Sequence, residues 1–212
     1  MAQPSVVTIA GQIGSAAEDV AARVAEKLSV PLLDREIVSR AASRAGVSEE
    51  TIEEAERVPS FLTRMVELLG RFPASPELEF PAPDVPAIPP MTVDAYRHLV
   101  EDVVTRVADG PGGAVILGHA AQVILKDHPS ALHVFVARPF DLRVRWMAEQ
   151  LNKDLAAAEK RLKEIGRQRM NFYQTYYKVN WMDPHLYDLM INTRQIPPDL
   201  AAQLVIDVAQ HI

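Results

Sequence analysis

The turn after the first apolar run of the chain has the composition of a phosphate-binding site. A β-branched run at residues 6–10 leads into Gly11, and Gly14 follows just before a segment with apolar residues at four-residue spacing. A strand, a glycine-containing turn and a helix N-terminus together form a cradle for phosphate, because the unpaired N–H groups of the helix point at the anion. We therefore predict that a phosphorylated cofactor binds at Gly11, Gln12, Ile13, Gly14, Ser15, Ala16, Ala17 and Glu18.

The end of this turn departs from the pattern G-x-x-x-x-G-K-[ST] that phosphate-binding loops usually carry. Ala16 stands at the second glycine, Ala17 at the lysine and Glu18 at the hydroxyl residue. Ala17 cannot reach the β- and γ-phosphates, and Glu18 cannot replace a magnesium-binding hydroxyl. A charge-assisted hydrogen bond contributes about 1.5–3 kcal/mol, so another cation would have to replace the lysine. Glu18 and Asp19 also have an interpretation without a ligand, because acidic side chains in a first turn interact favourably with the helix dipole.

The composition is that of a protein with an ordinary packed core. Its 212 residues are 48% hydrophobic, carry a formal net charge of −6 and include no cysteine. This length predicts a single domain over residues 1–212, and the acidic balance argues against a nucleic-acid partner. The absence of cysteine excludes disulfides and thiolate metal sites, and the histidines show no ligand spacing, so we predict no metal site within the chain. We see neither a membrane-spanning run nor a signal peptide, which predicts a cytoplasmic protein without membrane contact.

Predicted strands and helices alternate along most of the chain. Strands are predicted at residues 5–10, 30–33, 114–117, 132–136 and 187–191. Helices are predicted at residues 15–28, 34–45, 92–108, 120–126 and 154–178, from residue 139 and at the C-terminus. This alternation is typical of an α/β fold with a parallel sheet. Residues 71–91 interrupt it with seven prolines, and we predict an insertion that is either packed through its apolar side chains or a poorly ordered loop.

Several short motifs occur in an order and spacing that resemble the cytidylate-kinase-like family, relatives of the nucleoside monophosphate kinases. The motifs lie at residues 9–21, 31–37, 115–125, 132–137, 143, 167–181 and 183–193, so the resemblance covers nearly the whole chain. In this family the turn often reads G-S-G-G with an arginine after it, and the absence of the lysine is therefore partly a family trait. Here Ala16, Ala17 and Glu18 replace those glycines and that arginine.

The resemblance implies a three-layer P-loop kinase-like fold with a central parallel sheet, a helical acceptor-binding region and a helical lid at residues 154–181. It also implies an activity, the transfer of the γ-phosphoryl group of ATP to CMP or a similar small phosphorylated acceptor, with Mg²⁺. Such a reaction depends mostly on positioning and charge neutralisation, so the arginines would be the most important side chains.

The resemblance also implies an acceptor site. Its residues would be Asp34, Arg35, Arg40, Gly118, His119 and Arg143. Arg40 could bind the acceptor phosphate bidentately, although Asp34 could equally be a helix N-cap and Arg35 and Arg40 surface charges. The family has an arginine where this chain has His119, and a histidine is mostly neutral at pH 7. His119 therefore indicates either a weaker, pH-dependent acceptor site or a lost contact.

In the lid, the resemblance assigns the catalytic neutralisation of phosphate charge to Arg161, Arg167 and Arg169. Lys163 or Arg167 could supply the charge that Ala17 lacks. The alternative is an ordinary basic helix face.

Aromatic residues follow these arginines at helical spacing. They could stack on a base, pack the lid, or contact a second subunit and make the protein a homodimer. The cluster consists of Phe172, Tyr173, Tyr176, Tyr177 and Trp181.

Two functions stay open on the sequence alone. The first is an ATP-dependent nucleotide kinase, which Asp34, Arg40 and the lid arginines favour. The second is a catalytically degenerate kinase-like scaffold that binds a nucleotide or a protein partner. The residues that favour it are Ala16, Ala17, Glu18 and His119.

Overall fold

A computed structural model describes residues 6–34 and 93–212 of the chain. The described residues fall into two units, and residues 93–103 belong to the one formed by residues 35–103. In that unit they form the first part of helix α5 (Val93–Ala108). The other unit, formed by residues 1–34 and 104–212, contains the remaining elements, including every strand of the sheet.

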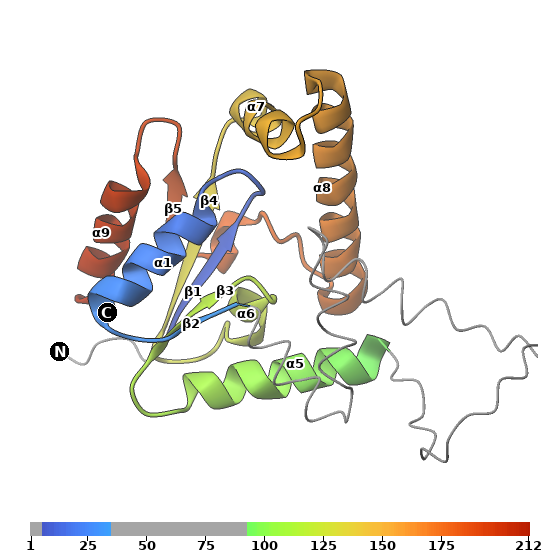
Figure 1. Ribbon diagram of the computed structural model, residues 1–212. Helices are drawn as coiled ribbons and strands as arrows, with labels where there is room; N and C mark the ends of the chain where they lie inside the picture. Colours follow the sequence, from blue (N-terminus) through green and yellow to red (C-terminus); the bar gives the residue numbers. More distant parts are fainter. Residues whose placement is uncertain (1–5, 35–92) are drawn as a thin grey trace, which may run out of the picture. The chain divides into compact units, whose positions relative to one another are not determined.

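A five-stranded sheet forms the centre of this unit, with the strand order β2-β3-β1-β4-β5 (Figure 1). Every neighbouring pair is parallel, which confirms the predicted α/β class. The strands are β1 (Val6–Gly11), β2 (Leu32–Leu33), β3 (Ala114–Leu117), β4 (Ala131–Ala137) and β5 (Leu189–Asn192). Strand β1 is central, with Val7 opposite Val115 of β3 and Leu132 of β4. The loop that follows β1 therefore begins in the middle of the sheet's carboxyl edge, where open α/β sheets bind ligands.

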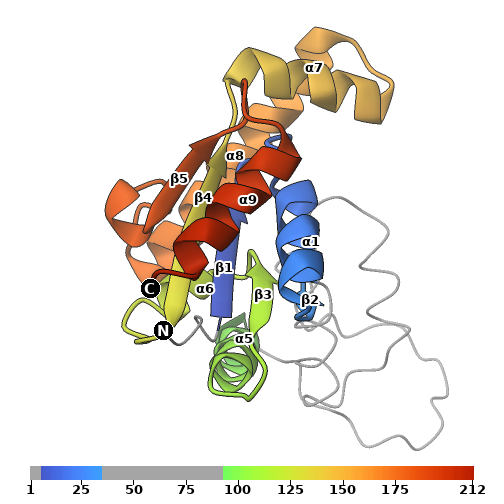
Figure 2. The same cartoon turned by 90° about the vertical axis from the view of Figure 1, so that its left-hand side faces the viewer.

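Helices cover both faces of the sheet. They are α1 (Ala17–Leu28), α6 (Ala121–Ile124), α7 (Phe140–Leu151), α8 (Leu155–Tyr177), the 3-10 helix η1 (Pro184–Leu186) and α9 (Pro198–Ala209). Helices α1 and α9 lie side by side on one face, in front of the strands in Figure 2, and pack on Val134 and Val136. Phe135 points to the opposite face, where it packs with Tyr173 of α8. The unit therefore has the three layers that were predicted.

Helices α7 and α8 form a pair with a small apolar core of their own. Val144 and Met147 of α7 pack against Leu162 and Ile165 of α8. The N-terminus of α8 is capped by Asp154, whose carboxylate accepts a hydrogen bond from a backbone N–H three residues later at 2.8 Å. This pair holds the part of α8 that lies beyond the sheet.

One predicted strand boundary differs from the structure, and several predicted features lie outside the described residues. The last strand begins at Leu189, later than the predicted residue 187, and the 3-10 helix η1 precedes it at residues 184–186. The predicted helix over residues 34–45, the proline-rich insertion at residues 71–91, Arg35 and Arg40 lie outside the described residues. Within residues 6–34 and 93–212, no helix is long and apolar enough to cross a membrane.

The loop between β1 and α1 turns through two residues with left-handed backbone, Gly14 and Ala16. Gly14 has a φ of +77°, and a Cβ at this position would lie 2.9 Å from Cε3 of Trp146, so both the conformation and the close contact require glycine. Ala16, the N-cap of α1, has a φ of 64° and a ψ of 27°. This left-handed conformation costs a residue with a Cβ about 1–2 kcal/mol. The alanine thus keeps, at a cost in stability, a turn that glycine would form more easily.

Substitution of Ala16 by glycine should therefore stabilise the protein. We expect Ala16→Gly to raise the free energy of unfolding by about 0.5–1 kcal/mol, because glycine adopts the left-handed conformation without strain. The matched control is Ala22→Gly, at an exposed position in the middle of α1, which should lower the same quantity by about 0.5–1 kcal/mol. Urea unfolding measures both. A loss of stability in Ala16→Gly would contradict the strained turn.

His133 is a buried histidine whose tautomer is set by its partners. Its Nε2 lies 3.2 Å from the carbonyl oxygen of Leu125, which can only accept, so Nε2 carries the proton. Its Nδ1 then accepts from the Thr8 hydroxyl at 2.7 Å. Burial lowers the pKa of His133 below its usual value, and the nearby charge of Asp188 offsets this only in part. The folded state therefore favours the neutral imidazole.

This lowered pKa makes stability depend on pH. Because the folded state resists protonation of His133, the unfolded state binds more protons once the pH falls below about 6.5, and stability should decrease there. We expect His133→Gln to be less stable than wild type at pH 7.5 by about 1–3 kcal/mol, through loss of buried hydrogen bonds, and to lose less on going to pH 5.5. Thermal unfolding at both pH values measures this. The exposed control His211→Gln should keep the wild-type pH dependence, and an equal loss in His133→Gln would refute the assignment.

Candidate functional site

The β1–α1 loop is fixed to the neighbouring strands by hydrogen bonds. The Gln12 N–H donates to the Val136 carbonyl at 3.1 Å, and the Ser15 N–H donates back to the Gln12 carbonyl at 2.9 Å. From the far side, the Thr193 hydroxyl donates to the Ser15 carbonyl at 2.8 Å. The loop is therefore held from β4 and from the end of β5, so its backbone is positioned before any ligand arrives.

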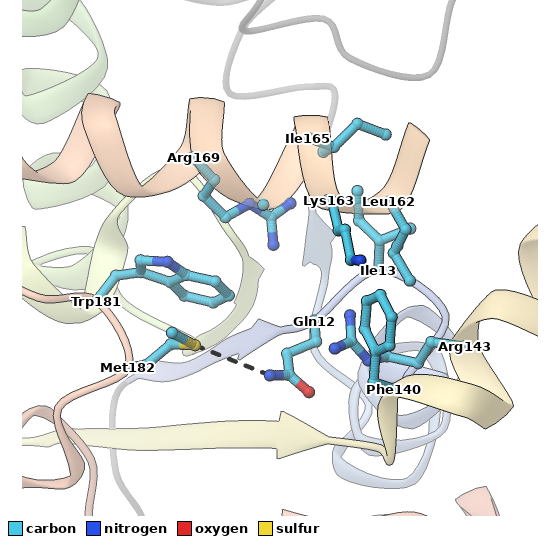
Figure 3. Close-up of a pocket in the computed structure, with 11 residues that line it drawn as sticks. Gln12, Ile13, Phe140, Arg143, Leu162, Lys163, Ile165, Arg169, Trp181 and Met182 are labelled. Atoms are coloured by element: carbon cyan, nitrogen blue, oxygen red, sulfur yellow. Dashed lines mark hydrogen bonds between the residues drawn. The ribbon is translucent and has the colours of Figure 1, made fainter. Parts of the chain in front are cut away.

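A pocket of about 200 Å³ lies between this loop and α8 (Figure 3). We call it the loop pocket, and its walls combine apolar side chains with three cations. It is lined by Gln12, Ile13, Phe140, Arg143, Leu162, Lys163, Ile165, Gly166, Arg169, Trp181 and Met182. The first two come from the predicted phosphate-binding turn and the others from α7, from α8 and from the segment after α8. A pocket with this lining suits a ligand that is anionic at one end and apolar at the other.

Arg169 brings a cation directly to the loop. Its Nη1 donates to the Gly11 carbonyl oxygen at 2.6 Å. Its guanidinium carbon lies 5.1 Å from the centroid of the Trp181 ring, within the range of a cation–π contact. Arg169 is the predicted lid arginine that the structure places at the turn.

Arg143 faces the same pocket from α7. Its Nε donates to the Arg138 carbonyl oxygen at 3.0 Å. Burial lowers the pKa of the Arg143 guanidinium, and repulsion from Arg169 lowers it further. Within residues 6–34 and 93–212, neither Arg143 nor Arg169 forms a salt bridge with a carboxylate. Two positive charges that repel each other, with no ion-pair partner among the described residues, make this pocket attractive to an anion.

The other basic residues predicted for the lid lie differently. Arg161 forms an ion pair with Glu164 at 3.4 Å, and Lys163 reaches Glu159 at 2.5 Å although it also lines the loop pocket. Arg167 is exposed. Among the hydrogen bonds and ion pairs of residues 6–34 and 93–212, none joins these three side chains to the loop.

Arg138, which the sequence analysis did not select, is a third arginine beside the loop. It directly follows β4, its Nη1 donates to the Gly14 carbonyl at 3.4 Å, and its backbone N–H donates to the Gln12 side chain at 3.2 Å. Its position at the carboxyl end of a predicted strand was the signal that could have identified it.

Two predicted acceptor residues come together at the ends of β2 and β3. The His119 Nε2 lies 3.5 Å from a carboxylate oxygen of Asp34, and the His119 side chain is 8% exposed. Gly118, His119 and Ala120 have φ values of 77°, 55° and 56°, a run of left-handed residues that turns the chain sharply after β3. The structure thus places Asp34, Gly118 and His119 at one edge of the sheet.

The acidic first turn of α1 lines a second hollow, of about 770 Å³, which shares no lining residue with the loop pocket. Glu18 and Asp19 are exposed there, and Arg138 and Arg194 line the same hollow. Ala17 is buried in the core beneath the loop, 2% exposed.

Among the described residues there is no group of three or more His, Asp or Glu side chains that could hold a metal ion.

The predicted aromatic cluster packs within the unit. Tyr173 stacks on Trp181 with ring centroids 5.8 Å apart, and Phe172 contacts Tyr173, Tyr176 and Tyr177. These contacts bind α8 to the segment that follows it. Packing therefore accounts for the helical spacing of the rings.

Solved structures share this fold. A protein from Eubacterium ventriosum ATCC 27560 is similar over 98% of this chain and 99% of that chain, with a TM-score of 0.67 and 17% identity. The shikimate kinase from Bacteroides thetaiotaomicron is similar over 97% of this chain and 96% of that chain, with a TM-score of 0.52 and 12% identity. At these identities the likeness concerns the fold alone, and it confirms the P-loop kinase-like class.

Sequence comparison adds the family. A cytidylate kinase of Halobacterium salinarum (strain ATCC 29341 / DSM 671 / R1) is 29% identical over 76 residues, which are 36% of this chain and 40% of that relative. The matched stretch thus spans about two fifths of the curated relative's length. The model of the cytidylate kinase-like family matches residues 6–195, a range that includes every strand of the sheet, the loop and α8. The chain therefore belongs to the cytidylate kinase-like family.

Proposed function

We propose that this protein is an ATP-dependent phosphotransferase of the nucleoside monophosphate kinase type, which transfers the γ-phosphoryl group to CMP or a similar small phosphorylated acceptor. The observation that carries the proposal is the pair of half-buried guanidinium groups of Arg143 and Arg169 beside the loop. Neither forms a salt bridge with a carboxylate in residues 6–34 and 93–212. Membership of the cytidylate kinase-like family supports the reaction class.

In this proposal the β1–α1 loop binds the donor phosphates through the backbone N–H groups at the start of α1. Arg169 and Arg143 supply the positive charge that a lysine at position 17 would otherwise bring, and Arg138 adds a third charge beside Gly14. The described residues hold no metal cluster of their own, so Mg²⁺ would be bound mainly through phosphate oxygens, where its chemistry is to neutralise charge.

The acceptor would lie at the carboxyl ends of β2 and β3. There Asp34 can accept hydrogen bonds from the acceptor, and the space beside Gly118, where a Cβ would meet nothing within 4 Å, leaves room for it to approach. Arg35 and Arg40, outside the described residues, complete this part of the proposal. Because the donor and the acceptor would be free nucleotides, we place the reaction in the cytoplasm.

Removal of either pocket arginine should weaken nucleotide binding. We expect Arg169→Ala and Arg143→Ala each to lower the affinity for MgATP about 10- to 100-fold, the equivalent of one charge-assisted hydrogen bond of about 1.5–3 kcal/mol. The matched control is Arg145→Ala, two residues from Arg143 and exposed on α7, which should bind MgATP as wild type does. Titration calorimetry measures the affinities, and a coupled assay of ADP release with CMP, UMP and AMP measures transfer.

The outcome for the wild type decides between the two functions that the sequence left open. MgATP binding together with ADP release that depends on one of the monophosphates supports the enzyme. If wild type neither binds MgATP nor transfers phosphate to any of them, the proposal is wrong and the chain is a degenerate scaffold. If Arg145→Ala loses as much affinity as Arg169→Ala, the loop pocket is not where the charge acts.

A further inference from the structure

We infer that Trp181 is a positioning residue, whose indole ring holds the Arg169 guanidinium against the β1–α1 loop. The inference rests on the proposed function, since it assigns to Trp181 a role in binding the donor phosphates. Two contacts of Arg169 carry the inference: its Nη1 donates to the Gly11 carbonyl, and its guanidinium carbon lies over the Trp181 ring. A guanidinium carries five N–H donors, so the contact with Gly11 leaves others for a phosphate.

The indole ring is itself held in place from several sides. Tyr173 stacks on it with centroids 5.8 Å apart, and Phe135 of β4 meets it edge-on at 5.5 Å. The Tyr187 hydroxyl donates to the Trp181 carbonyl oxygen at 2.5 Å. The Trp181 side chain is 4% exposed. A ring restrained by two aromatic neighbours and a backbone hydrogen bond is a rigid surface for a long, flexible arginine side chain.

A buried glutamine ties these restraints together. Gln122, 1% exposed, donates from its Nε2 to the hydroxyls of both Tyr173 and Tyr187, each at 3.2 Å. Burial raises the pKa of both hydroxyls, so they remain protonated and keep this arrangement at any physiological pH. The network connects the end of β3, through α6, to α8 and to the segment that carries Trp181.

Packing alone does not explain why this residue is a tryptophan. The indole Nε1 is buried and has no hydrogen-bond partner among the described residues, which costs stability that a phenylalanine would not lose. Tryptophan gives the strongest cation–π contact of the aromatic residues. The next residue, Met182, contacts the Gln12 side chain at 3.8 Å, so the same segment meets both the arginine and the loop. An indole at position 181 therefore costs some folding stability but gives a stronger contact with the Arg169 guanidinium.

A double-mutant cycle separates positioning from packing. The single variants are Trp181→Phe, Trp181→Leu and Arg169→Ala, and the double variant combines Trp181→Leu with Arg169→Ala. We expect Trp181→Leu to weaken MgATP binding about 10-fold and Trp181→Phe about 3-fold, in line with the strength of a partly buried cation–π contact. In the Arg169→Ala background, Trp181→Leu should change the affinity less than about 2-fold, because its effect acts through the missing guanidinium.

The unfolding temperature is the quantity that would change if the role of Trp181 were purely structural. Trp181→Phe should unfold only slightly below the wild-type temperature, since removal of the unpartnered N–H offsets part of the cost of the smaller ring, while its MgATP affinity falls. The packing control is Phe172→Leu, in the same aromatic cluster, which should unfold at a lower temperature but bind MgATP as wild type does. Titration calorimetry and thermal unfolding of the same preparations give both quantities.

Each outcome bears on a different claim. Equal losses from Trp181→Leu with and without Arg169, or an unchanged affinity in both tryptophan variants, would overturn the positioning role while the proposed function stands. A wild type that does not bind MgATP would overturn the proposed function, and the role of Trp181 with it. If Trp181→Leu does not fold, Trp181→Phe alone and combined with Arg169→Ala completes the cycle.

Discussion

The fixed position of the β1–α1 loop, at the middle of the sheet's carboxyl edge, is the constraint on which the rest of the site depends. Strand β1 is buried between β3 and β4, and the loop that leaves it is tied to the Val136 carbonyl on one side and to the Thr193 hydroxyl on the other. Gly14 must be glycine to lie against Trp146. With the backbone held in this way, the carbonyls of Gly11 and Gly14 become fixed points that the surrounding arginines can reach.

In the proposed function, the charge that the loop lacks comes from elsewhere in the chain. A lysine in the loop would place one cation on the phosphates from within, whereas here Arg138, Arg143 and Arg169 approach from the end of β4, from α7 and from α8. Guanidinium groups suit this task, because they stay charged under partial burial and can bind phosphate oxygens in pairs. Two of them repel each other in the absence of ligand, and an anion would relieve that repulsion. The positive charge beside the loop therefore depends in part on where α8 packs, because α8 carries Arg169.

The sequence was most informative where local chemistry decides the structure. Alternating patterns predicted the parallel α/β sheet, and Gly11 and Gly14 marked the turn. Which lid arginine meets the loop was beyond the sequence, because Arg161, Arg167 and Arg169 share one helix and only the docking of α8 selects Arg169. Arg138 was missed because it lies in no motif. The partners of Trp181 come from β4 and α8, and no spacing along the chain reveals a contact of that kind.

A crystal structure of the wild-type protein with MgADP tests the central claim most directly. The account predicts that the β-phosphate lies within hydrogen-bond distance of backbone N–H groups in residues 12–17, with the Arg169 guanidinium on one of its oxygens and still over the Trp181 ring. A nucleotide bound with its phosphates away from this loop, or phosphates on the loop with Arg143 and Arg169 both directed elsewhere, would contradict it.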